Sequence, residues 1–139
     1  MNIVDASVAT LWFVDEPFAE RARALLTTGR RLAPDLIVPE VANALWKIAR
    51  TGAVSPEQAE QALRDLPDAV ETTSTVALAP RAFAIARALK HPAYDCFYLA
   101  LSEALQAPFV TLDHKLFNRT RGTPWAALTT LLGGEPALT

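Results

Sequence analysis

Residues 1–14 read MNIVDASVATLWFV, and this stretch decides how the rest of the chain is interpreted. Ile3 and Val4 are apolar and β-branched, which favours a buried strand, and they run directly into Asp5. An apolar segment without strict alternation then follows from Ala6. The stretch predicts a strand over Met1–Val4, a short helix over Ala6–Phe13, and a carboxylate at the junction between them.

Beyond this first unit, strands and helices alternate along the chain. Helical signals predict helices at Pro17–Thr28, Leu36–Arg50, Ser55–Leu66, Ala79–Leu89 and Ala93–Leu105, with a short one opened by Asp113. Strands are predicted at Leu32–Ala33, Val70–Thr75, Phe109–Leu112 and Trp125–Leu132. Pro39 is expected to kink or restart its helix. This order predicts an α/β fold with a parallel sheet and helices on both faces.

Length and composition favour one domain without covalent staples. The chain has 139 residues and a single cysteine, Cys96, which cannot form an internal disulfide. No apolar run is long enough to span a bilayer, and no basic region precedes the first apolar stretch. We therefore expect a cytoplasmic protein with no signal peptide and no membrane partner.

Four of the fifteen carboxylates have mostly apolar neighbours. They are Asp5, Glu40, Asp95 and Asp113, and the first and last each directly follow a predicted strand. Ligands of open parallel sheets gather beyond the carboxyl ends of the strands. A carboxylate in apolar surroundings is costly unless its charge is compensated, and a divalent cation is one such compensation.

Helix capping is the alternative explanation for three of these carboxylates. Asp5, Asp95 and Asp113 lie near predicted helix starts, where aspartate accepts hydrogen bonds from free N–H groups. Glu40 lies inside a predicted helix, so its alternative is an ordinary surface position. Asn43 falls three residues later on the same helix face and is placed to orient it.

Taken in order, the four segments resemble the successive motifs of PIN-domain ribonucleases, and VapC-type toxins are the nearest match. The segments are Val4-Asp5-Ala6-Ser7-Val8, Pro39-Glu40-Val41-Ala42-Asn43-Ala44-Leu45, Tyr94-Asp95-Cys96-Phe97-Tyr98-Leu99-Ala100-Leu101 and Val110-Thr111-Leu112-Asp113. The resemblance implies a PIN-like three-layer α/β/α fold with a central parallel sheet, forming a single PIN domain over residues 1–139. It also implies a metal-dependent endoribonuclease that acts as the toxin of a type II toxin–antitoxin pair.

The same resemblance assigns roles to individual residues. Asp5, Glu40, Asp95 and Asp113 become a catalytic, metal-binding quartet for Mg²⁺ or Mn²⁺, supported by the polar side chains of Ser7, Asn43 and Thr111. Both ions are hard cations that prefer oxygen ligands. The three aspartates are assigned as direct or water-bridged ligands, and Glu40 as a ligand of a second metal or a group that orients the attacking water. Asn118 stands where some family members offer a further acidic group.

Histidines and basic residues complete the candidate site. His91 and His114 have no neighbouring metal ligands, so we interpret them as surface histidines. Candidate RNA contacts are Lys47, Arg50, Lys115, Arg119 and Arg121, whose alternative is a solvated face. The net charge is −2, and setting aside four metal-binding carboxylates leaves +2 for the remaining surface, which is compatible with RNA.

Apolar residues make up 51% of the chain and mean hydropathy is +0.17, so a partner is expected to cover part of the surface. Trp12, Phe13, Phe18 and Trp46 are candidates for a partner groove, with core packing as the alternative. The family resemblance implies a cognate antitoxin protein as that partner and a homodimer of the chain itself.

Three alternative functions share features with this sequence. A haloacid-dehalogenase-type phosphatase also ends its first strand in aspartate, but it needs a second aspartate where this chain has Ser7. A phospho-accepting receiver domain needs an acidic pair after the first strand and a lysine after a late strand, and neither is visible. A catalytically degenerate PIN-fold RNA-binding module is the remaining alternative.

Overall fold

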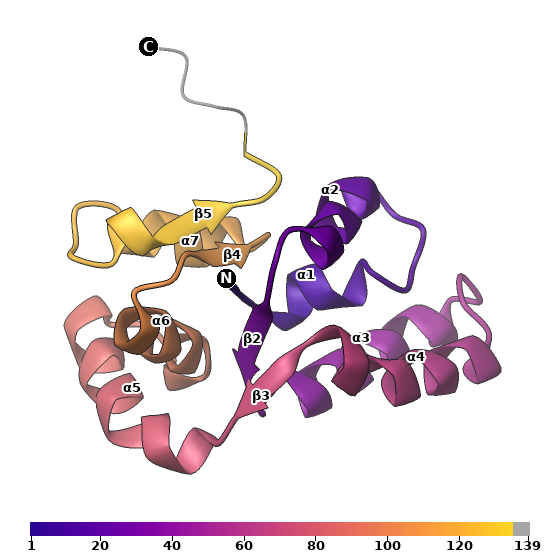
Figure 1. Ribbon diagram of the computed structural model, residues 1–139, viewed down its shortest axis with the longest axis horizontal. Helices are drawn as coiled ribbons and strands as arrows, with labels where there is room; N and C mark the ends of the chain where they lie inside the picture. Colours follow the sequence, from indigo (N-terminus) through magenta and orange to yellow (C-terminus); the bar gives the residue numbers. More distant parts are fainter. Residues whose placement is uncertain (135–139) are drawn as a thin grey trace.

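Five parallel strands form the centre of the protein in the computed structural model, which describes residues 1–134 (Figure 1). The strands are β1 (Asn2–Val4), β2 (Arg31–Pro34), β3 (Glu71–Thr73), β4 (Phe109–Thr111) and β5 (Thr129–Leu131). They lie in the order β3-β2-β1-β4-β5, and every pairing between neighbours is parallel. The predicted α/β class with a central parallel sheet is confirmed.

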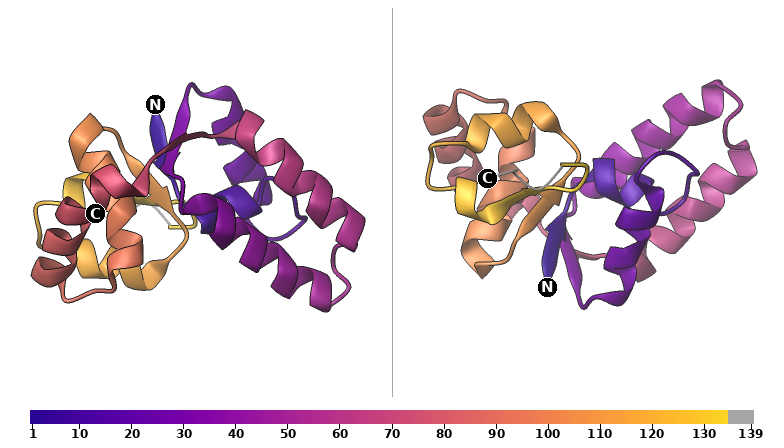
Figure 2. Two further views of the ribbon diagram at one scale, coloured as in Figure 1. Left: turned by 90° about the horizontal axis from the view of Figure 1, so that it is seen from below. Right: turned by 90° about the horizontal axis from the view of Figure 1, so that it is seen from above.

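Within residues 1–134, seven α-helices surround this sheet. They are α1 (Ala6–Thr10), α2 (Ala19–Ala24), α3 (Ile37–Arg50), α4 (Pro56–Ala69), α5 (Thr75–Leu89), α6 (Ala93–Leu105) and α7 (His114–Thr120), with 3-10 turns at Leu25–Thr27 and Ala126–Leu128. Helices α5 and α6 lie on one side of β1 and β2, and helices α1 to α4 lie on the other (Figures 1 and 2). Within residues 1–134, no helix is both long and apolar enough to cross a membrane.

The neighbouring strands β1 and β4 are largely buried, which explains why their sequences do not alternate between polar and apolar residues. Ile3 and Val4 of β1 are fully buried, as is Phe109 of β4. Strands covered by helices on both faces have no solvent side, so they lack the alternation of an edge strand. The core therefore forms around β1 and β4.

The position of β1 creates the crevice that the sequence analysis anticipated. β1 pairs with β2 on one side and with β4 on the other, so the connections from these strands diverge at their carboxyl ends. In the register of β1 and β4, Val4 lies opposite Val110. The next residues, Asp5 and Thr111, therefore meet side by side at the carboxyl edge of the sheet.

Local differences from the predicted elements have physical causes. The expected restart at Pro39 is wrong: α3 runs from Ile37 to Arg50 as one helix. Pro39 occupies its first turn, where the N–H groups have no intrahelical partner to lose. Helix α5 begins at Thr75 and not at Ala79, because the Ser74 hydroxyl accepts a hydrogen bond from the Val76 N–H and caps the helix. The strand predicted over Val70–Thr75 accordingly ends at Thr73.

Candidate active site

Asp5 is the most deeply buried carboxylate of the predicted quartet, with only 8% of its surface exposed. It accepts a hydrogen bond on Oδ1 from the Ser7 hydroxyl at 2.5 Å, and on Oδ2 from the Thr111 hydroxyl at 2.5 Å. Oδ1 also caps α1 by accepting from the Val8 N–H at 3.3 Å. The capping alternative is therefore correct for Asp5, but it accounts for only one of three hydrogen bonds.

Thr111 connects Asp5 to Asp113. Its Oγ1 donates to Asp5 and accepts from the Asp113 backbone N–H at 3.0 Å. The Asp113 carboxylate caps α7 by accepting from the Leu116 N–H at 3.1 Å. Ser7 makes a similar link, because its Oγ accepts from the Leu112 N–H at 3.1 Å. The predicted supporting residues Ser7 and Thr111 thus join the ends of β1 and β4.

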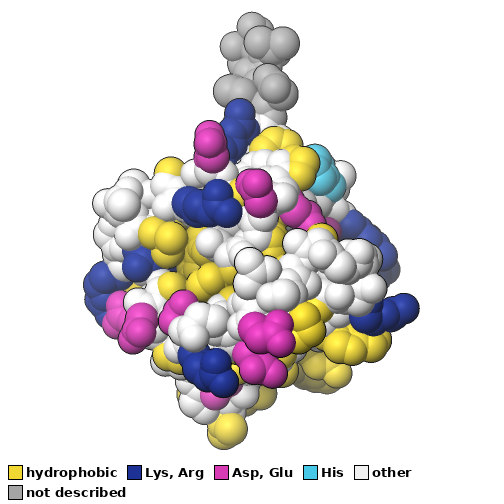
Figure 3. Space-filling view, turned by 90° about the vertical axis from the view of Figure 1, so that its right-hand side faces the viewer, with side chains coloured by type: hydrophobic (Ala, Val, Ile, Leu, Met, Phe, Trp, Pro, Cys, Tyr) yellow, Lys and Arg dark blue, Asp and Glu magenta, His cyan; other side chains and the backbone are white. Residues whose placement is uncertain are grey.

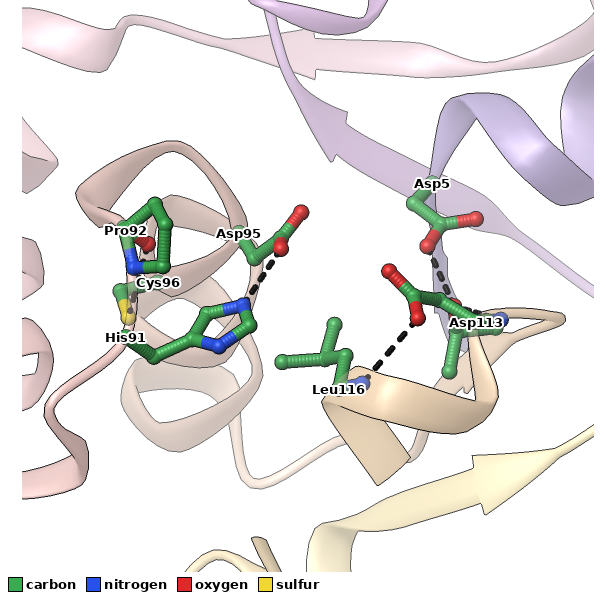
Figure 4. A network of polar contacts seen from close by, with 8 residues as sticks. Asp5, His91, Pro92, Asp95, Cys96, Asp113 and Leu116 are labelled. Carbon is green, nitrogen blue, oxygen red and sulfur yellow. Dashed lines mark hydrogen bonds and ion pairs between the residues drawn. The ribbon is translucent and has the colours of Figure 1, made fainter. Parts of the chain in front are cut away.

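Asp95 reaches the same region from the opposite side of the sheet. Figure 4 shows the carboxylates of Asp5, Asp95 and Asp113 around one common space, supplied by the end of β1, the first turn of α6 and the start of α7. Asp95 does not cap its helix, since Pro92 occupies the cap position. The capping alternative is wrong for this residue.

His91 corrects the sequence analysis, which interpreted it as a surface histidine. Only 7% of its surface is exposed, and its Nε2 lies 2.6 Å from Oδ2 of Asp95. His114, by contrast, is exposed as expected. The sequence did carry a signal for the contact: a histidine four residues before an aspartate, separated from it by a proline that starts a helix.

Glu40 lies in the first turn of α3 and contacts α6 through Tyr98. The Tyr98 hydroxyl donates to Oε1 of Glu40 at 2.5 Å, and the Tyr98 ring stacks on Phe109 of β4 with 5.7 Å between ring centroids. Sequence reasoning missed this role of Tyr98, which the spacing of Asp95 and Tyr98 on one face of α6 would have suggested.

Burial dominates the electrostatics of these carboxylates. Desolvation raises the pKa of Asp5 from 3.8 to about 6, against the opposing effect of its hydrogen bonds, and the charge of Asp95 adds to the rise. Desolvation likewise raises the pKa of Glu40, and Asp95 contributes there too. The charge of Asp95 thus contributes, after burial, to the raised pKa of both groups.

A divalent cation fits this arrangement. Among residues 1–134, no lysine or arginine forms an ion pair with Asp5, Glu40, Asp95 or Asp113. A buried carboxylate without a basic partner is the kind of group that coordinates metal. No three acidic, histidine or cysteine side chains in this part of the chain converge closely enough to hold an ion together. Mg²⁺ commonly retains several waters and takes only one or two carboxylates directly, so water-bridged binding is the mode that these residues suit.

The remaining predicted residues are distributed unevenly. Asn43 is exposed and makes no hydrogen bond to Glu40 within the described residues. Lys115 and Arg119 are exposed on α7 and line, with Asn118, a surface cavity of about 650 Å³. Lys47 and Arg50 lie exposed on α3.

Arg121 differs from the other basic candidates because its guanidinium is occupied. It donates to the carbonyl oxygens of Phe117, Ala126 and Thr129, and it lies 3.8 Å from the centroid of the Phe117 ring. These bonds tie the end of α7 to the segment that leads into β5, which gives Arg121 a structural task.

Comparison with known proteins agrees with the architecture of the site. The PIN domain family matches residues 3–122, a range that includes all four carboxylates. Ribonuclease VapC3 of Pyrobaculum aerophilum is 36% identical over 123 residues, which cover 84% of this chain and 92% of the relative. Ribonuclease VapC9 of Mycobacterium tuberculosis is 36% identical over 119 residues, which cover 84% of this chain and 88% of the relative.

Solved structures show the same fold. PAE2754 from Pyrobaculum aerophilum superposes with a TM-score of 0.64 at 23% identity, covering 88% of this chain and 81% of that one. VapC20 of Mycobacterium tuberculosis, described as a sarcin-ricin loop cleaving toxin, has a TM-score of 0.60 at 14% identity and covers 80% of this chain and 87% of its own. The family match, the sequence relatives and the fold agree: the chain belongs to the PIN-domain family as a VapC-type member.

Proposed function

We propose that this chain is an endoribonuclease that requires Mg²⁺ or Mn²⁺ and acts as the toxin of a type II toxin–antitoxin pair. The observation that carries the proposal is the buried Asp5 carboxylate. It has no basic partner among the described residues, and it shares a pocket at the carboxyl edge of the sheet with Asp95 and Asp113. The VapC ribonuclease relatives supply the reaction class.

Asp5, Asp95 and Asp113 are the groups that would hold the cation, directly or through water. When bound, a divalent cation stabilises negative charge on a phosphodiester and favours ionisation of water. Ser7 and Thr111 keep both oxygens of Asp5 in fixed directions through their hydroxyl groups. These two hydrogen bonds hold the Asp5 carboxylate in place, which limits the reorganisation that cation binding would require.

Glu40 is the group we assign to the attacking water. Desolvation raises its pKa, and a carboxylate with a raised pKa is a better proton acceptor near neutral pH. The Tyr98 hydroxyl fixes Oε1 of Glu40, which leaves Oε2 as the oxygen available to the water. Attack by the water oxygen on phosphorus forms one P–O bond and breaks the bond to the leaving ribose oxygen.

RNA would approach this pocket along α7. Lys115 and Arg119 are exposed in the turns that follow Asp113 and line one cavity. Lysine and arginine contacts to phosphate position a nucleic acid without reading its sequence. These two side chains are therefore assigned to the RNA backbone. Lys47 and Arg50, which are exposed on α3, are assigned as further phosphate contacts.

The antitoxin is the partner we assign to the face formed by α1 to α4. On the side that Figure 3 shows, hydrophobic side chains gather in a hollow surrounded by charged ones. Trp46 of α3 is 55% exposed and Phe18 is also exposed, whereas Trp12 is buried and donates its indole N–H to the carbonyl of Ala22. Of the four aromatic residues named as groove candidates, Trp12 belongs to the core and Phe13 is partly buried against it.

The proposed homodimer would use a separate apolar surface on α5. Val76 and Phe83 expose 82% and 63% of their surface, and Tyr94 at the start of α6 is also exposed. Side chains of this size are rarely left in water without a partner when they gather on one face. The proposal predicts that Phe83→Glu yields a monomer in analytical ultracentrifugation, while Arg64→Glu on α4 leaves the association state unchanged.

Cleavage of RNA by the purified chain, freed of its antitoxin, tests the proposed function. We expect cleavage with Mg²⁺ or Mn²⁺, none with EDTA, and a loss of cleavage of about a thousandfold in Asp113→Asn. Asp68→Asn is the matched control, because Asp68 is an exposed residue of α4. Tight RNA binding without cleavage would favour a catalytically degenerate module. Hydrolysis of small phosphomonoesters would favour the phosphatase alternative, against which Ser7 already counts because it supplies a hydroxyl and no second carboxylate.

A further inference from the structure

We infer that His91 is a positioning residue that fixes the Asp95 carboxylate for cation binding, an assignment that rests on the proposed function. The His91 Nε2–H donates to Oδ2 of Asp95 at 2.6 Å. Figure 4 shows the other carboxylate oxygen of Asp95 directed away from the imidazole. The histidine holds one oxygen, and Oδ1 would be the atom left for the cation or its water.

The backbone around His91 holds the imidazole in this place. Helix α5 ends at Lys90, whose φ of 53° lies in the left-handed region that non-glycine residues adopt only when their surroundings impose it. Pro92 follows with a fixed φ and occupies the cap position of α6. The Cys96 thiol donates to the Pro92 carbonyl oxygen at 3.6 Å. His91 thus lies between the end of α5 and the start of α6, and this backbone keeps its ring beside Asp95.

The burial of His91 indicates that its side chain serves to hydrogen-bond with Asp95. Within the described residues, Nδ1 of His91 is buried and has no hydrogen-bond partner. An unpaired buried polar atom costs free energy, so a residue chosen only to fill this space would be apolar, like its buried neighbour Leu89. The donor on Nε2 is what distinguishes histidine from an apolar side chain at this position.

His91 fixes the orientation of the Asp95 carboxylate in the site. Groups that hydrogen-bond to metal ligands fix the orientation of those ligands, and their removal typically weakens metal binding by about 10–100-fold. Asp5 has two hydroxyl donors for this purpose, and Glu40 has Tyr98. Asp95 has His91, so each of these three carboxylates has a side-chain donor outside the pocket.

Two variants of nearly equal size separate positioning from packing. His91→Gln retains an N–H donor, whereas His91→Met has none, and Gln and Met have similar length and flexibility. The affinity for Mn²⁺ is measured by isothermal titration calorimetry, and the free energy of unfolding in EDTA is measured alongside. We expect His91→Met to weaken Mn²⁺ binding by about 10–100-fold, and His91→Gln to remain within about threefold of the unsubstituted protein. Raising the Mn²⁺ concentration should then restore RNA cleavage in His91→Met.

Leu89→Ala is the matched control for lost stability, because Leu89 is buried at the same helix end and makes no polar contact. It should lower the free energy of unfolding and leave the Mn²⁺ affinity unchanged. His91→Phe serves as the donor-free variant if His91→Met does not fold. Unchanged Mn²⁺ affinity in either donor-free variant, or equal weakening in His91→Gln and His91→Met, overturns the assignment of His91 alone. Failure of the unsubstituted protein to bind Mn²⁺ overturns the proposed metal site itself.

Discussion

Replacing Asp5 by asparagine should stabilise the metal-free protein at neutral pH. Burial raises the pKa of this carboxyl from 3.8 to about 6, so the ionised form is disfavoured in the folded chain. Asparagine has nearly the same shape and carries no charge. It can still accept from the Val8 N–H that Asp5 caps, so α1 retains its cap in the variant.

The magnitude follows from the pKa difference. A rise from 3.8 to about 6 corresponds to about 3 kcal/mol of free energy that the ionised carboxylate costs the fold. The folded protein binds the Asp5 proton more tightly than the unfolded chain does. The stability gained from protonation of Asp5 is therefore complete below about pH 4 and is lost as the pH rises through about 6. When the pH is lowered from about 7 to about 5, protonation of Asp5 should therefore add about 1.4 kcal/mol to the free energy of unfolding. In Asp5→Asn, the new side-chain amide faces the Ser7 and Thr111 hydroxyl groups with less favourable hydrogen bonds. This should reduce the stabilisation from removing the charge by about 1 kcal/mol.

Urea unfolding of both proteins in EDTA, at about pH 5 and pH 7, measures this difference. Asp5→Asn should be more stable than the unsubstituted protein by about 2 kcal/mol at pH 7, and by less than about 1 kcal/mol at pH 5. Comparing the two proteins cancels the opposite pH dependence of Glu71 and Glu103, whose pKa values are lowered mainly by their hydrogen bonds to arginine. Mn²⁺ at about a hundred times its dissociation constant should add about 2.7 kcal/mol to the unsubstituted protein and much less to the variant. A difference that does not change with pH, or a variant less stable at pH 7 in EDTA, would show that burial does not disfavour the ionised Asp5 carboxylate.

Two further predictions concern the surroundings of the pocket. Tyr98→Phe removes the hydroxyl that donates to Glu40 but keeps the stack on Phe109. RNA cleavage should therefore fall, while the free energy of unfolding changes by no more than about 1 kcal/mol. Equal cleavage rates for the two proteins would show that Glu40 does not need the Tyr98 hydroxyl for its orientation. Arg119→Ala should weaken RNA binding, measured by filter binding, and lower the slope of log affinity against log salt by about one. Arg121→Ala should mainly lower the free energy of unfolding in urea, by about 1–3 kcal/mol. A larger loss of RNA binding in Arg121→Ala than in Arg119→Ala would reverse the assignments.

The parallel sheet was predictable because its signals are local. Ile3-Val4 and Phe109-Val110 are short apolar runs, each followed by a polar junction, and each forms a strand within a residue of the expected ends. Asp5 and Asp113 could be placed for the same reason, since each directly follows a strand. The register that puts Thr111 beside Asp5 depends on strand pairing, which no local signal specifies.

Contacts between helices were less accessible from the sequence. Tyr98 and Glu40 are 58 positions apart, and their hydrogen bond depends on how α6 and α3 approach across the carboxyl edge of the sheet. His91 was misinterpreted because a histidine beside a helix terminus is usually solvated, and its burial follows from the left-handed turn at Lys90. The occupied guanidinium of Arg121 follows from the packing of the β5 segment, which amino-acid type does not reveal.

Hydrolysis of RNA in heavy-oxygen water tests most directly the claim that a carboxylate pocket activates water with a divalent cation. The purified chain is incubated with RNA and Mn²⁺ in this solvent, and mass spectrometry of the early products identifies the new termini. We expect one heavy oxygen in each newly formed terminal phosphate, no 2′,3′-cyclic phosphate, and no products in EDTA. A 2′,3′-cyclic phosphate among the early products, or cleavage that persists in EDTA, would contradict it, because the ribose hydroxyl would then be the nucleophile or the cation would be unnecessary.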